Sequence, residues 1–147
     1  MSRIYPMRHR HDLPSDTAGS TAIEFAFLAP LYLVLVLGMT AYGIYFGAAH
    51  SVQQLSADAA RTAIAGLDAR ERQALARRFI TDNADGYMLI DSTKLTVEVG
   101  DSQTDSSQFD VTLRYDATHL PIWALWEGLP MPEKVILRRA TIRMGGI

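Results

Sequence analysis

The sequence contains no cysteine, and it contains no Asp, Glu, Lys or Arg between Glu24 and Asp58. The first absence excludes disulfides, thiol catalysis and cysteine-based metal sites, although an exported chain can fold without disulfides where burial suffices. The second absence places a long apolar stretch near the N-terminus of this 147-residue chain, while the rest has the mixture of a soluble domain. We therefore expect one membrane segment and one small domain.

Sequence patterns that carry catalysis or ligand binding are also missing. The chain has no glycine-rich phosphate loop and no nucleophile elbow, and neither His50 nor His119 has carboxylate or histidine neighbours at ligand spacing. Asp101 and Asp105 lie in a polar stretch without a calcium-loop pattern. A formal net charge of -2 argues against a nucleic-acid partner. We expect no enzymatic activity, no cofactor and no metal.

The uncharged stretch from residue 25 to residue 49 is rich in Leu, Val, Ala and aromatic residues. As a helix it would be roughly 37 Å long, which exceeds the hydrocarbon core of a bilayer at about 30 Å. The apolar core of a cleavable secretory signal is shorter, at about 7–15 residues. The stretch therefore predicts a transmembrane helix over residues 20–49.

The charges that flank this segment predict its orientation. Arg3, Arg8 and Arg10 precede it, and the first Lys or Arg after it is Arg61. Because basic residues are retained on the cytoplasmic side, we expect a single-pass membrane protein. Its N-terminus would be cytoplasmic, and residues 50–147 would form a periplasmic or extracellular domain.

Glu24 is an acid at the beginning of the apolar stretch, directly before Phe25. A carboxylate at the edge of hydrocarbon is costly unless it reaches water or a partner. One interpretation is an interfacial acid at a helix N-terminus, where the helix dipole favours negative charge. The other is a functional acid, because the small residues before it are typical of a segment that a peptidase can hold in extended form.

Two overlapping motifs favour the second interpretation. The motif GSTAIEF at residues 19–25 resembles the processing site of type IV pilins and pseudopilins. The stretch AIEFAFLAP at residues 22–30 resembles the N-terminal signature of TadE-like proteins, which are minor pseudopilins of the tight-adherence (Tad, or Flp) pilus machinery. The close resemblance covers about residues 18–48, and the remainder agrees only in size and layout.

The resemblance implies a processing site and an assembly site. A prepilin peptidase would cut after Gly19, remove the cytoplasmic leader of residues 1–19 and leave Ser20 as the new N-terminus. Glu24 matches the family's acid at the fifth position of the mature chain and would pair with the Ser20 amine of a neighbouring subunit. Phe25 and Pro30 belong to the same assembly segment. Pro30 should kink or loosen the helix, either as a tolerated membrane proline or as a point that melts during assembly.

The resemblance also implies a location in a bacterial inner membrane and a function. The chain would be a minor subunit that assists initiation, capping or bridging during assembly of a Tad or Flp pilus. Its partners would be a prepilin peptidase, other pilins and pseudopilins, an inner-membrane assembly platform and the lipid bilayer. The alternative is an uncleaved, signal-anchored envelope protein whose outer domain binds a partner.

Beyond the membrane segment, helical periodicity continues to about residue 65, and Gly66 is a plausible end. Asp68 and Glu71 have the spacing of a capping box, which predicts a second helix ending near Asn83. Leu75 and Phe79 would form its apolar stripe.

From Lys94 the apolar period changes to two, which predicts a hairpin with strands around residues 95–99 and 109–115. A last strand is expected over residues 135–144, with a bulge where the alternation slips at Arg138 and Arg139. The predicted fold class is α+β. A long N-terminal helix, transmembrane in its first half, would pack with a second helix and a small antiparallel sheet, as in pilins.

The connection over residues 120–132 is unusually apolar and contains both tryptophans, Trp123 and Trp126. It could cover the core of the small sheet. It could also form a patch for a subunit contact or for the membrane interface, since Trp is enriched in both places.

Overall fold

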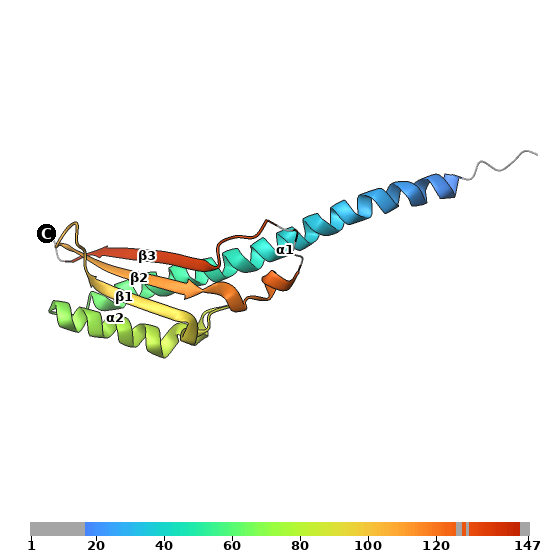
Figure 1. The fold of residues 1–147 in the computed structure, drawn as a ribbon. Helices are drawn as coiled ribbons and strands as arrows, with labels where there is room; N and C mark the ends of the chain where they lie inside the picture. Colours follow the sequence, from blue (N-terminus) through green and yellow to red (C-terminus); the bar gives the residue numbers. More distant parts are fainter. Residues whose placement is uncertain (1–16, 126–127, 129, 145–147) are drawn as a thin grey trace, which may run out of the picture. The chain divides into compact units, whose positions relative to one another are not determined.

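The structure, a computed structural model, describes residues 17–125, 128 and 130–144. The chain divides into two compact units, with the boundary between Leu35 and Val36. The predicted leader lies mostly outside the described residues, as do Arg3, Arg8 and Arg10. The described elements are two α-helices, four short 3₁₀ turns and three strands (Figure 1). This composition confirms the predicted α+β class.

Helix α1 spans Thr17–Ala63, and it crosses the boundary between the two units. Pro30 lies inside α1 and does not end it. The helix ends in tightened i→i−3 turns, in which the amide of Ile64 donates to Arg61 O at 3.2 Å and the amide of Gly66 donates to Ala63 O at 3.0 Å. The end predicted at Gly66 is therefore close to the observed one.

Helix α2 spans Ala69–Asn83 and begins as the capping box predicted. The Asp68 carboxylate accepts the Glu71 amide at 2.8 Å, and the Glu71 carboxylate accepts the amide of Leu67 at 2.7 Å. The buried residues of α2 are Ala76 and Ile80. The predicted stripe of Leu75 and Phe79 is only half-buried. The buried residues Ala76 and Ile80 each follow a stripe residue by one position in the sequence.

The sheet consists of β1 (Leu95–Asp101), β2 (Gln108–Asp116) and β3 (Val135–Arg143), in the order β1-β2-β3. Both neighbouring pairs are antiparallel. The predicted hairpin is confirmed by a continuous register from Leu95 opposite Tyr115 to Asp101 opposite Phe109. Alternate residues of β2, from Phe109 to Tyr115, are completely buried.

The bulge expected in β3 is wrong. Each residue from Val135 to Arg143 pairs with one residue of β2, without an insertion. Arg138 lies opposite Leu113 and is half-buried on the inward face, and its guanidinium donates to Leu137 O at 2.8 Å. A long arginine stem can occupy an inward position at a sheet edge while its charged end reaches outward. Such a residue disturbs the apolar alternation without disturbing the backbone.

One hydrophobic cluster joins the second part of α1 to the sheet. It contains Val52, Leu55 and Ala59 from α1 together with Phe109 and Leu113 from β2, all without exposed surface. Full burial of such large side chains contributes about 1.5–3 kcal/mol each. The cluster therefore fixes the later part of α1 within the domain and leaves the earlier part uncovered.

Candidate membrane and assembly surface

The first half of α1 carries large apolar side chains that no other part of the described chain covers. Every residue from 21 to 40 is exposed or half-exposed, and Phe27 has 80% of its surface accessible. The exposed large residues of this part are Ile23, Phe25, Phe27, Leu28, Leu31, Tyr32, Leu33, Leu35, Val36 and Met39. A helix that is apolar all round needs a protein core or lipid around it.

The apolar surface of α1 is long enough to cross a membrane. The described helix from Thr21 to Ala63 contains a window with a mean hydropathy of 2.1, and no residue of that window is buried. Residues 21–40 correspond to a length of about 30 Å, which equals the thickness of a hydrocarbon core. By length and composition this helix fits a membrane protein.

The sheet domain covers one face of α1 from Ala41 onward. Ala41 has no exposed surface, and neither have Ala48 and Val52. The uncharged stretch of residues 25–49 therefore consists of an exposed part and a part that is packed on one face against protein. The transmembrane span of residues 20–49 stays a prediction, and burial favours its end near residue 40.

Glu24 lies within α1 on the exposed apolar part. The first turn of α1 contains no acidic residue, since the helix begins at Thr17. The effect of the helix dipole decays within the first turn, so it gives little stabilisation to Glu24. A chain cut before Ser20 would still have a full turn before Glu24. The dipole interpretation is therefore the weaker of the two, and both interpretations of Glu24 stay predictions.

Gly19 and Ser20 belong to the first turn of α1, where the structure describes the backbone alone. The amides of a first helical turn have no partner within the helix, so this turn unwinds more easily than the interior. A peptidase that holds its substrate in extended form would need only this local unwinding.

Phe25 and Pro30 complete the predicted site. Phe25 is 70% exposed, and Pro30 is exposed in the middle of the apolar part. Pro30 has no amide hydrogen, so the carbonyl of Ala26 lacks the usual helical donor. Successive residues of a helix are rotated by about 100°. Glu24, Phe25 and Pro30 consequently point in different directions and form a surface around the helix instead of a pocket.

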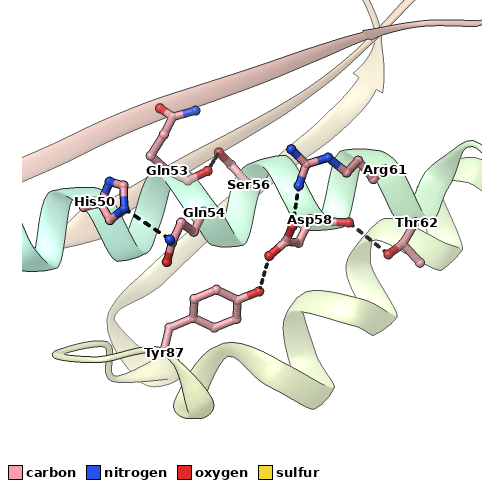
Figure 2. A network of polar contacts seen from close by, with 8 residues as sticks. All are labelled: His50, Gln53, Gln54, Ser56, Asp58, Arg61, Thr62 and Tyr87. Carbon is pink, nitrogen blue, oxygen red and sulfur yellow. Dashed lines mark hydrogen bonds and ion pairs between the residues drawn. The ribbon is translucent and has the colours of Figure 1, made fainter.

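A polar network in the sheet domain ties the loop at Tyr87 to α1. Figure 2 shows Asp58, which accepts Arg61 at 2.7 Å and the Tyr87 hydroxyl at 2.8 Å. Burial raises the pKa of Tyr87 to about 12, and the hydrogen bond to Asp58 and its charge add to this shift. His50, in the same view, pairs only with the amide of Gln54 at 3.1 Å. These contacts hold the domain together.

No metal-ligand cluster was found among the described residues, which contain no group of three or more His, Cys, Asp or Glu side chains placed to hold an ion. His119 instead contacts the Tyr115 hydroxyl at 2.8 Å, and the same hydroxyl donates to Leu89 O at 2.8 Å. This contact was not anticipated from the sequence. It closes the loop before β1, where Leu89 has a φ of 64°.

Comparison with known proteins agrees with the N-terminal motifs. The family of TadE-like proteins matches residues 19–61, which include the motif at residues 19–25, the exposed part of α1 and most of its buried part. The match confirms the resemblance predicted from the N-terminal motifs. A search of curated proteins and a search of solved structures each returned no match.

Proposed function

Since residues 19–61 match the TadE-like family, we propose that this protein is a minor pilin-like subunit of a Tad or Flp pilus. It assists initiation, capping or bridging during assembly. The observation that carries the proposal is the exposed apolar part of α1, which begins within the motif at residues 19–25. A helix that is uncovered in one chain is suited to pack against lipid first and against other subunits later.

In the proposed maturation, a prepilin peptidase cuts after Gly19 and frees the α-amine of Ser20. Such an amine has a pKa of about 8 and is cationic near neutral pH. Arg3, Arg8 and Arg10 of the leader would hold the N-terminus in the cytoplasm. The domain after α1 would then be exported, and the assembly platform would meet the membrane-embedded part.

Glu24 would set the contact between neighbouring subunits. Its carboxylate would meet the Ser20 amine of the next subunit in an apolar bundle, where opposite charges attract more strongly than in water. The pair would offset part of the cost of burying each charge. Because one acid meets one amine, the pair would also fix the axial register.

The decisive experiment replaces Glu24 by Gln. We expect Glu24→Gln to be cut and inserted normally and to be absent from pilus fractions and from crosslinks to other pilins. The loss should amount to several kcal/mol, because removing one partner of a desolvated pair leaves the other charge uncompensated. Glu98→Gln is the matched control, since Glu98 is exposed on β1 in the outer domain. Normal co-assembly of processed Glu24→Gln would refute the intersubunit pair.

The first residue of the mature protein distinguishes the proposed pilin-like subunit from the alternative, an uncleaved signal-anchored envelope protein. Mass spectrometry of the membrane-extracted protein should show Ser20 as the first residue. Gly19→Leu should leave the precursor intact in the presence of a prepilin peptidase. An intact leader in the unmodified protein would favour the alternative, and a reporter fused after Ile147 that works only in the cytoplasm would overturn the orientation.

A further inference from the structure

In the connection between β2 and β3, the exposed residues that the structure describes from Pro121 to Pro132 have no polar side chain. Between Asp116 and Glu133 the only Asp, Glu, Lys or Arg is Glu127. The buried residues Leu120 and Ile122 fix this connection to the core. The short turn η4, Pro121–Ala124, then leaves Pro121 and Ala124 exposed. Packing in the core explains why Leu120 and Ile122 are apolar, but it does not explain the exposed Pro121 and Ala124.

This connection lies beside α1 where the helix becomes covered. The Tyr42 hydroxyl donates to Pro130 O at 2.9 Å, one turn after the exposed Met39. In Figure 1 the orange connection follows β2 and lies next to α1 at one end of the sheet domain. Within the unit that begins at Val36, the exposed apolar surface of residues 36–40 therefore continues through Tyr42 onto the connection, without an intervening charged residue among those described.

Trp123 has the surroundings of an interfacial tryptophan. It is half-buried, and its Nε1 donates to Ala117 O at 2.7 Å, so its polar atom is satisfied inside the protein. The Lys134 ammonium lies 5.6 Å from the centre of its ring. Tryptophan and tyrosine rings prefer the headgroup level of bilayers, and a lysine beside them can reach lipid phosphate.

We infer that the outer surface of Pro121–Leu125, together with Pro130 and Tyr42, rests on the headgroup layer of the membrane from which α1 emerges. The inference depends on the proposed anchoring by residues 21–40. The occupant is a phospholipid surface, because the patch adjoins the exposed apolar residues 36–40 of α1 and has Lys134 next to the ring of Trp123. The contact would hold the sheet domain at the bilayer surface before assembly.

The chain contains only two tryptophans, which makes the inference directly measurable. Trp126→Phe leaves Trp123 as the sole tryptophan in the full-length protein. We would reconstitute this variant in phosphatidylcholine vesicles whose chains carry bromine either near the headgroup or near the terminal methyl. Trp123 emission should fall with both lipids, with an about twofold larger loss for the shallow bromine, because its ring lies at headgroup depth.

Two further variants in a Trp123→Phe, Trp126→Phe background serve as references. Tyr32→Trp, in the exposed part of α1, should be quenched by both lipids. Leu67→Trp, in the turn between α1 and α2 and 92% exposed, should be unaffected. If Tyr32→Trp is quenched and Trp123 is not, the anchoring stands and the headgroup contact is overturned. If Tyr32→Trp is not quenched, the anchoring itself has failed.

A second copy of the chain is the competing occupant. In that case Trp123 emission would depend on the protein-to-lipid ratio and would be insensitive to bromine. That result would overturn the lipid contact in favour of a subunit contact. Bromine quenching that stays constant as the protein is diluted in lipid supports the inference.

Discussion

The two halves of α1 differ in the size and the burial of their apolar side chains. Residues 21–40 carry large apolar groups such as Phe25, Leu31 and Tyr32, which are exposed on all sides of the helix. From Ala41 to Ala63 the buried face consists mainly of alanines with Val52 and Leu55. Large groups suit a fluid lipid environment, whereas small groups let a sheet approach the helix closely.

The polar residues differ in the same way. The second half has an outer polar face, on which Gln54, Asp58 and Arg61 are at least partly exposed, whereas Glu24 is the only charged residue of the first half. A helix with a polar face and an apolar stripe is suited to contact water on one side and a protein core on the other. A helix without a polar face is suited to an apolar environment on all sides. One continuous helix can therefore have two parts that are suited to different surroundings. Matched substitutions in the two parts test this difference.

The largest effect on domain stability is expected from Leu55→Ala. Leu55 has no exposed surface, so its truncation removes buried apolar area and leaves a cavity, at a cost of about 2–5 kcal/mol. Leu31→Ala, with Leu31 being 66% exposed, should leave the unfolding of the domain unchanged. Urea unfolding of the full chain in detergent, followed by tryptophan emission, measures both. Equal losses for the two variants would contradict the division of α1.

A smaller effect is expected from Gly66→Ala. A Cβ at Gly66 would lie 2.6 Å from Arg72 N and 2.9 Å from its Cα, which are backbone atoms of α2. The turn between the helices would have to open, at a cost of about 1–3 kcal/mol.

Gly43→Ala is the matched control for that substitution. A Cβ at Gly43 would meet nothing within 4 Å, and alanine is the better helix former by about 1 kcal/mol. Gly43→Ala should therefore be neutral or slightly stabilising in the same urea assay. Destabilisation of the isolated subunit by Gly43→Ala would show that this exposed stretch is packed after all.

The smallest effect is expected from Tyr87→Phe, which removes the hydrogen bond to Asp58 at a cost of about 1 kcal/mol. The folded pKa of Tyr87 is raised from 10.0 to about 12. A raised pKa means that the folded state retains the proton longer, so this stabilisation is complete below pH 10 and is lost as the pH rises towards 12. Stability measured from pH 9 to 12 should fall less steeply in Tyr87→Phe than in the unmodified protein. An unchanged slope would show that another group causes the alkaline loss.

Much of the fold could be predicted from local patterns. The capping box of Asp68 and Glu71 predicted the beginning of α2, and alternation around Val111 predicted the hairpin. Both signals depend on neighbours in sequence. The bulge at Arg138 was wrong because periodicity cannot tell an inward arginine at a sheet edge from a shift in register. The apolar stripe of α2 was predicted in part: Phe79 packs half-buried against the core, whereas the buried residues are Ala76 and Ile80.

The sequence by itself determined the apolar helix, the motif around Glu24 and the order of helices and strands. These properties follow from hydrophobicity, charge and spacing along the chain, and the family match at residues 19–61 agrees with them. Only the tertiary structure decided where α1 passes from an exposed surface into a core, because the residues that cover Ala41 and Val52 come from distant parts of the chain. The position of Tyr42 beside Pro130 has the same origin. Contacts between segments far apart in sequence depend on how closely their backbones approach. The periodicity of residues along the chain does not predict that distance.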